Sequence, residues 1–399
     1  WGEALSRGPN INVTSDGKVV MSDVDRVEAF KAIEKAKELM NSASLKEQDY
    51  INALSSRYNG KVETGRNLLD RQYAESMEAL SKKYPEDMDA ASLFAESLMN
   101  TMPWNYWAED GNPKPDTIKV ISSLEDVLEK APEHPLAIHL YIHAVEASSS
   151  PERAEAAADR LGALVPGAGH LVHMPAHIYW RVGRYHDASE ANIKAAEVDE
   201  EYIAQCNAQG FYPALYYPHN IHFLWAASTM EGRSGLSIES ALKVAKYVGP
   251  EQIRQFPVVE FFHTIPLLSY VRFGKWEEIL SYSTPAPEFK YSSGIYHYAR
   301  GIALSALGRK EDALKELGFI RPLIDTPEIK SLVKAGQPSA QLLEIAVNLL
   351  QGQIDFMEGD FETSINNFKK AVALQDDLPY TEPPFWYYPT RQSLGKVLI

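Results

Sequence analysis

A repeat of 34 residues runs through the middle of this 399-residue chain and limits how it can fold. Pro132 and Pro166 are 34 positions apart, and so are Ala154 and Ala188. A unit of this length holds two helices and a turn, and it cannot bury its apolar face alone. Stacked units share a core and leave an extended concave surface. We therefore expect an all-α solenoid of helix-turn-helix units.

The turns between paired helices follow a recurrent glycine pattern. In the unit from Gly169 to Tyr202, the run Gly183–Ala188 marks the turn. Similar turns are expected at Gly232, Gly274, Gly308 and Gly359. Apolar residues at helical spacing precede them, so the later part of the chain is predicted to be a regular array.

The N-terminal part is less regular. We expect helical segments near Val24–Met40 and Leu45–Tyr84 and a loop over Gly8–Met21. Two further segments, Thr101–Asp116 and Gln205–Pro218, interrupt the repeats as insertions. Both can roof the concave groove, which mildly favours an enclosed pocket.

We divide this continuous solenoid into three regions. Residues 1–86 form an N-terminal helical region with a truncated first repeat and a loop, 87–252 form the central repeats, and 253–399 form the C-terminal repeats and a capping helix. The chain opens at Trp1 without Met or a signal-like segment, so we expect residues to be missing upstream. Periplasmic and cytoplasmic locations both stay open.

Composition excludes several classes of partner and site. The formal net charge of -15 argues against nucleic acid and against an anionic membrane surface, since both require a basic face. We also expect no membrane span, because no stretch approaches about 20 apolar residues. Cys206 is the single cysteine, so disulfides and multi-thiolate zinc sites are excluded. A metal would need histidine, carboxylate, tyrosine or backbone ligands.

Histidines are concentrated in the central region, where eight of the eleven occur between positions 139 and 222. His139, His143 and Glu146 have the i, i+4, i+7 spacing that places side chains on one helical face. The sequence therefore predicts a row of potential ligands along this helix.

A second row follows one repeat later. His170, His173 and His177 share a helical face by the same rule, and the 34-residue period makes His173 and His177 equivalent to His139 and His143. Adjacent helices lie about 8 to 10 Å apart, so imidazoles from both rows can converge on one ion.

Further candidates come from the flanking helices. Alignment of the later turns places His219 and His222 at the positions of His170 and His173. Glu96, on a preceding helix, is expected to face the same groove. The result is a belt of potential ligands across four neighbouring helices.

A single groove-facing histidine is more often a peptide contact or a solvated residue than a ligand. The paired rows differ, because neighbouring imidazoles repel when protonated and a shared metal explains why they are concentrated. Glu146 can serve as a ligand or a general base. Arg181 can orient an anionic substrate or fix Glu146, the alternative being a groove salt bridge.

Three blocks of this region carry a resemblance to a known family. His143–Ser148, His170–Tyr179 and Tyr217–Trp225 resemble a group of bacterial tetratricopeptide-repeat proteins known mainly as uncharacterised sequences. The opening Trp1–Leu5 and the ending Trp386–Gly395 resemble the same group. The resemblance implies a right-handed superhelical solenoid of tetratricopeptide repeats, and it supplies no established reaction.

We expect a metalloprotein, and favour an enzyme, with His139, His143, His173 and His177 as main ligands. Glu146, His170, His219, His222 and Glu96 complete one or two centres. Copper, iron and zinc all suit this set. Copper or iron would support oxidative chemistry, which we favour, and zinc would support hydrolysis. The substrate would be a small molecule or peptide in the groove. The alternatives are a metal-free peptide-binding scaffold and a metal storage or delivery protein.

Overall fold

The computed structural model describes residues 14–15, 18–19, 21–61, 64–108, 110–206 and 211–399. The resemblance at Trp1–Leu5 and most of the expected loop over Gly8–Met21 lie outside these residues. The described chain divides into two compact units. Unit 1 holds the described residues up to Pro166 together with His177–Val182, and unit 2 holds Gly167–Ala176 and Gly183–Ile399.

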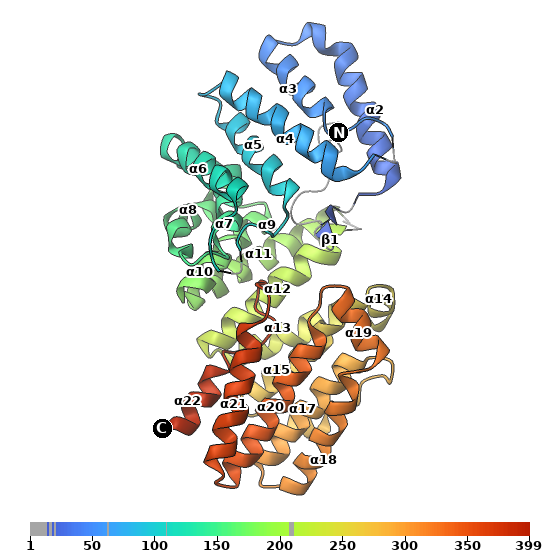
Figure 1. The fold of residues 1–399 in the computed structure, drawn as a ribbon, viewed down its shortest axis with the longest axis vertical. Helices are drawn as coiled ribbons and strands as arrows, with labels where there is room; N and C mark the ends of the chain where they lie inside the picture. The colour runs from blue at the N-terminus through green and yellow to red at the C-terminus, as the bar shows by residue number, and fades with distance from the viewer. Residues whose placement is uncertain (1–13, 16–17, 20, 62–63, 109, 207–210) are drawn as a thin grey trace. The chain divides into compact units, whose positions relative to one another are not determined.

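Unit 1 is a succession of helices that each pack on the next, as α4 does on α5 and α5 on α6 (Figure 1). Its elements are β1 (Thr14–Ser15), β2 (Lys18–Val19), α2 (Asp23–Leu39), η1 (Met40–Ser42), α3 (Leu45–Ser55), α4 (Arg66–Lys83), α5 (Met88–Thr101), α6 (Pro115–Lys130), α7 (Pro135–Val145), η2 (Pro151–Ala154) and α8 (Glu155–Leu164). The two short strands pair antiparallel, with Thr14 opposite Val19.

Unit 2 continues the same pattern, with α11 packed on α12, α17 on α18 and α20 on α21. Its elements are α9 (Gly169–His173), the start of α10 (Pro175–Val182), α11 (Tyr185–Cys206), α12 (Phe211–Glu231), α13 (Ser234–Tyr247), α14 (Pro250–Gln255), η3 (Pro257–Thr264), α15 (Ile265–Arg272), α16 (Trp276–Ser281), α17 (Lys290–Ala306), α18 (Lys310–Ile320), η4 (Arg321–Leu323), α19 (Pro327–Lys334), α20 (Ser339–Met357), α21 (Phe361–Asp376) and α22 (Arg391–Leu398).

All five expected glycine turns are confirmed. Each glycine lies between two helices in the left-handed region, with φ of 82° at Gly183, 84° at Gly232, 67° at Gly274, 74° at Gly308 and 80° at Gly359. Only glycine adopts this conformation without steric cost, and the loops that contain these glycines are two or three residues long. The described chain therefore has an all-α fold of tetratricopeptide-repeat type.

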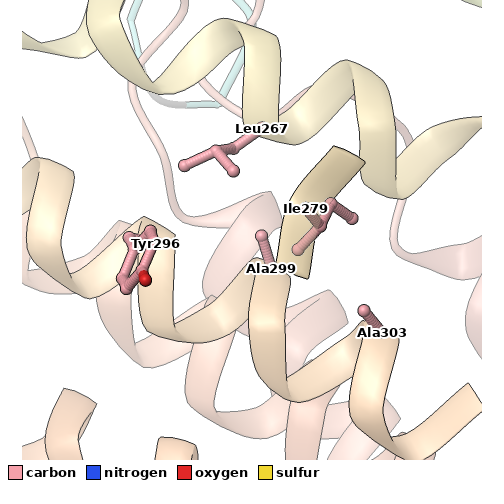
Figure 2. Packing of buried hydrophobic residues seen from close by; sticks show 5 residues of the cluster. All are labelled: Leu267, Ile279, Tyr296, Ala299 and Ala303. Carbon is pink, nitrogen blue, oxygen red and sulfur yellow. The ribbon is translucent and has the colours of Figure 1, made fainter. Parts of the chain in front are cut away.

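Small residues let neighbouring helices approach closely within unit 2. Figure 2 shows Leu267 of α15 and Ile279 of α16 beside Tyr296, Ala299 and Ala303 of α17. Ile279, Ala299 and Ala303 are fully buried. The two alanines leave room for the larger side chains, so the three helices share one continuous apolar core.

The prediction of one helical segment over Leu45–Tyr84 was wrong, because α3 and α4 are separate helices. The chain turns between them at Gly60, whose φ is 69°. A Cβ at Gly60 would lie 2.8 Å from the ring of Phe30, so the turn also requires a glycine for packing. The sequence signal was Asn59-Gly60, a common turn dipeptide.

The two predicted insertions had different outcomes. Between α5 and α6 the described residues of 102–108 and 110–114 form no helix, as expected for an insertion. The second insertion is much shorter than Gln205–Pro218, because α11 extends to Cys206 and α12 begins at Phe211. Pro218 lies inside α12 and does not end it. Tertiary packing on α11 and α13 sustains α12 across the missing backbone donor.

No helix among the described residues is both long and apolar enough to span a bilayer.

Candidate metal centre

In unit 1 the helix α7 carries two of the candidate histidines. Pro135 occupies its first turn, where a missing N–H costs nothing, and the His134 side chain accepts a hydrogen bond from the Ala137 N–H at 3.2 Å. His139 and His143 follow one turn apart, and Glu146 is the C-terminal cap of the helix. The N-cap His134 and the C-cap Glu146 define the two ends of α7, and so the positions along it of His139 and His143.

The carboxylate of Glu146 bonds two imidazoles at once. Its Oε1 lies 2.8 Å from Nδ1 of His143, and its Oε2 lies 2.8 Å from Nδ1 of His177 on α10. All three residues are no more than 2% exposed. An ionised carboxylate only accepts hydrogen bonds, so both Nδ1 atoms donate to it. In each neutral ring the lone pair then lies on Nε2, on the opposite edge from Glu146.

More aromatic rings lie against this centre. The His143 ring is 4.9 Å from the His139 ring and 5.3 Å from the His177 ring, centroid to centroid. The Trp104 ring, from the irregular segment before α6, meets His143 edge-on at 5.1 Å. The indole of Trp107 donates to the carbonyl of Ala144 at 2.9 Å and ties the same segment to α7.

Burial favours the neutral form of His139 and His143. It lowers the pKa of His139 well below the ordinary value, and the neighbouring His143 and His177 lower it further. Burial also lowers the pKa of His143, although Glu146 opposes that shift. Neutral imidazole is the form that ligates metal.

The donor atoms of this centre lie close enough for one ion. One ligand atom from each of His143, Glu146 and His177 lies within 4.8 Å of the others. Imidazole and carboxylate ligands bind transition metals at about 2.0 to 2.2 Å. The residues of unit 1 therefore form a group that can hold a metal ion.

Unit 2 contains a second pair of histidines in contact. His173 of α9 and His219 of α12 place their Nε2 atoms 3.1 Å apart, with ring centroids 4.8 Å apart. Phe223 packs against both rings, at 5.0 Å from His173 and 5.7 Å from His219. His170 lies beside the pair, with its ring 6.1 Å from that of His173.

The helix that carries His170 and His173 was expected to run on through His177. The structure divides it into α9 and α10, with Met174 between them in helical conformation. The division occurs because Pro175 has no N–H to continue the hydrogen-bond ladder. Met174 itself keeps helical backbone angles, with φ of -50° and ψ of -38°.

Three predicted site residues lie apart from these groups. His222 packs among Trp225, Phe261 and Phe262, and burial lowers its pKa to about 3. Glu96 of α5 is half-buried. Burial lowers the pKa of the Arg57 guanidinium, but Tyr58, Asp70, Tyr73 and, least of these, Glu96 raise it above its ordinary value. Neither His222 nor Glu96 is in the ligand groups that the described residues form.

The third is Arg181, which belongs to unit 1. It is exposed, and its guanidinium donates to the carbonyl of Ser148 at 3.0 Å. It lies one helical turn beyond His177. This hydrogen bond places a positive charge near the carboxyl end of α7.

Sequence reasoning missed the residues that hold the imidazoles in place. Asn192 of α11 is fully buried, and its Oδ1 lies 2.7 Å from Nδ1 of His173. Trp104 was seen only as part of an insertion. Asn192 had a readable signal, because it is a polar residue four positions after the packing residue Ala188, where the second helix of a repeat is normally apolar.

The four histidines outside the predicted site have ordinary polar partners. His134 contacts Asp89, His186 contacts Glu231 and His297 contacts Glu316, each through one ring nitrogen at 2.6 to 3.1 Å. His263 contacts the carbonyl of Val248. His134 also accepts from the Ala137 N–H through its other ring nitrogen. Ordinary polar contacts of this kind need no metal.

Comparison of the sequence with protein-family models and with curated proteins gives no match. Solved structures with a similar fold include a tetratricopeptide repeat protein from Parabacteroides merdae, at 12% identity over 92% of this chain and 100% of that chain, with a TM-score of 0.36. Yeast Tom70 is 12% identical over 94% of this chain and 72% of its own, with a TM-score of 0.39. The human IFIT1 dimer with m7Gppp-AAAA is 13% identical over 99% of this chain and 84% of its own, with a TM-score of 0.38. These likenesses concern the fold alone.

Proposed function

We propose that this protein is a metal-binding scaffold of tetratricopeptide-repeat type, with a primary centre in unit 1. His143 and His177 are its main ligands, and His139 is the neighbouring candidate. The observation that carries the proposal is the buried Glu146 carboxylate bonded to Nδ1 of both main histidines at 2.8 Å.

Burial distinguishes this centre from a peptide-contacting surface. A side chain that recognises a peptide in a groove must be reachable, whereas His143 and His177 are each 2% exposed. Burying polar rings and a carboxylate together has a free-energy cost that requires compensation. A bound ion provides that compensation, since it attracts both the ring lone pairs and the negative charge.

Glu146 acts in this proposal as an orienting residue. Ligating histidines commonly donate their other ring N–H to a carboxylate, which fixes the tautomer and raises the basicity of the ligand nitrogen. Glu146 does this for two rings at once. Direct ligation by a Glu146 oxygen is the competing role, because Glu146 belongs to the same group of possible ligands as His143 and His177.

The types of ligand limit the possible metals to a few but do not select one of them. Cys206, the single cysteine, is exposed on α11, so the centre has no thiolate. Imidazole with a nearby carboxylate suits copper, iron and zinc. We propose oxidative chemistry on a small molecule or peptide, supplied by copper or iron; zinc would instead supply a hydrolytic nucleophile. Arg181 would attract an anionic group of the substrate from its exposed position beyond His177.

The test is metal content per chain in protein purified without a chelating tag and reconstituted separately with copper, iron and zinc. Wild type should retain metal after dialysis, whereas His143→Ala and His177→Ala should each lose the primary centre with unchanged helical circular dichroism. Full retention by both variants would contradict the assignment of these ligands.

A metal-free binding scaffold is the second candidate, and one observation favours it. A cavity of about 630 Å³ opens among α2, α3, α4 and α5 in unit 1, within the size range of small-ligand sites. Its lining includes the apolar residues Ile33, Leu54 and Met77 and three acidic residues, Glu47, Asp87 and Asp89, against one lysine, Lys46. A cationic peptide with apolar side chains would match this lining.

A further inference from the structure

Unit 2 contains a second histidine pair, of which His173 is fully buried and His219 partly buried. As in the primary centre, a polar side chain binds Nδ1 of one imidazole, but here it is an amide and not a carboxylate. His173 and His219 meet through their Nε2 atoms at 3.1 Å. Two ligands held at about 2.05 Å from one ion at the tetrahedral angle are separated by about 3.3 Å. The two nitrogens therefore already have the separation that a shared ion requires.

Asn192 decides which nitrogen of His173 carries the proton. Its Nδ2 donates to the carbonyl of Ala188 at 2.8 Å, so its Oδ1 is the atom that faces His173. Oδ1 only accepts, and it lies 2.7 Å from Nδ1 of His173. Nδ1 is therefore protonated, and the lone pair on Nε2 of His173 points at His219.

The tautomer of His219 follows from that of His173. Because Nε2 of His173 is an acceptor, the 3.1 Å contact requires Nε2 of His219 to donate. When an ion takes the place of this hydrogen bond, the proton of His219 moves from Nε2 to Nδ1. The ring stays neutral, so the exchange neither gains nor loses a proton.

Asp199 lies on the same face of α11 as Asn192 and contacts both helices that carry the histidines, α9 and α12. It lies seven residues after Asn192, two turns along the helix, and is 1% exposed. Its Oδ2 accepts from Nδ2 of Asn220, the neighbour of His219, at 2.7 Å. A Cβ at Gly169, the first residue of α9, would lie 1.9 Å from its Oδ1. One carboxylate thus contacts the start of α9 and the residue next to His219.

We infer that His173 and His219 form a second transition-metal site in unit 2, positioned by Asn192 and Asp199 and weaker than the primary centre. This rests on the proposed function in that it assigns metal to the same scaffold. The lower affinity follows from chemistry: the imidazole in unit 2 is supported by a neutral amide, whereas those in unit 1 are supported by a carboxylate, which raises ligand basicity and offsets the charge of the ion.

The experiment titrates zinc into the full chain against a chromophoric chelator. In the His139→Ala/His143→Ala background, where unit 1 has lost both α7 histidines, we expect about one equivalent to remain bound. Adding His219→Ala should remove it, and adding Asn192→Leu should weaken it by about tenfold or more. Ser189→Ala is the matched control, because Ser189 is fully buried on α11 and no hydrogen bond of its side chain to a described residue is found; it should leave affinity unchanged.

A second readout guards against misfolding of these variants. Nitrogen-15 histidine spectra of the metal-free wild-type chain should show His173 with its proton on Nδ1 and His219 with its proton on Nε2. Zinc should convert His219 to the Nδ1–H form. A His219 tautomer that does not change at saturating zinc would overturn the second site.

Different results would refute the proposed function and the second metal site. If the wild-type chain binds no zinc, copper or iron, the proposed function fails. If it binds metal that disappears in the His139→Ala/His143→Ala background, while His219→Ala and Asn192→Leu bind as wild type, the primary centre stands and the second site is refuted.

Discussion

Replacing Glu146 with glutamine tests the role of the shared carboxylate more sharply than any deletion. The amide has nearly the same shape, but it offers one acceptor and one donor where the carboxylate offers two acceptors. It can accept from Nδ1 of one histidine and must donate to Nδ1 of the other. That second ring then carries its proton on Nε2, on the atom that would ligate the ion.

The size of the effect can be worked out from the contacts. Both Glu146 hydrogen bonds are 2.8 Å long and buried. Charge-assisted hydrogen bonds contribute about 1.5 to 3 kcal/mol and neutral ones about 0.5 to 1.5, so the substitution weakens the support of the two ligands by about 2 kcal/mol in total. At about 1.4 kcal/mol per tenfold, the dissociation constant for zinc should rise about thirtyfold.

The assay is the same competitive zinc titration, and the matched control is Glu125→Gln. Glu125 is in unit 1, and its Oε1 accepts from Tyr141 and Arg153 and from no histidine. The control should bind zinc as wild type does. The reasoning is refuted if Glu146→Gln binds within about threefold of wild type, or if Glu125→Gln weakens binding as much.

Two stability predictions follow from close packing and burial. Gly169→Ala should lower the melting temperature of the metal-free chain, at a cost of about 1 to 3 kcal/mol of stability, because the new Cβ would overlap Asp199. Gly167→Ala is the control and should not lower it, because Gly167 has open space around it. Equal melting temperatures for the two variants would contradict the packing. His222 has a folded pKa of about 3, below its unfolded value near 6.5, so the unfolded state binds the proton first and stability falls as pH drops through that window. Between pH 7 and 5 the free energy of unfolding, measured with urea, should fall by about 2 kcal/mol on account of His222. His222→Phe should remove that part of the pH dependence, and an unchanged pH dependence in this variant would contradict the assignment.

The fold could be predicted from the sequence because its signals are local and repeated. Each turn glycine, such as Gly183 or Gly308, marks a backbone conformation that other residues rarely adopt, and the 34-residue period places it. The break at Gly60 was missed because the charged helices on either side lack that period. Pro218 led to the opposite error: the sequence predicts the end of an insertion there, whereas α12 continues through it because neighbouring helices pack against this helix.

The candidate centres could be predicted only in part. Spacing along one helix brings His143 and Glu146 together, and the repeat indicates His177 beside them. Direction within the repeat was not enough for His222, whose ring turns into the aromatic cluster of Trp225 instead of the ligand group. The supporting Asn192 comes from another helix, and its role depends on a tertiary contact that no spacing rule encodes.

The most direct test of the account is the number of moles of each metal per chain in untagged protein, measured by elemental analysis after reconstitution and dialysis. The account predicts retained copper, iron or zinc in wild type, with loss of the primary-centre ion in the His143→Ala/His177→Ala double variant at unchanged helicity. Metal-free wild-type protein after every reconstitution would contradict it and would leave the peptide-binding scaffold as the better description.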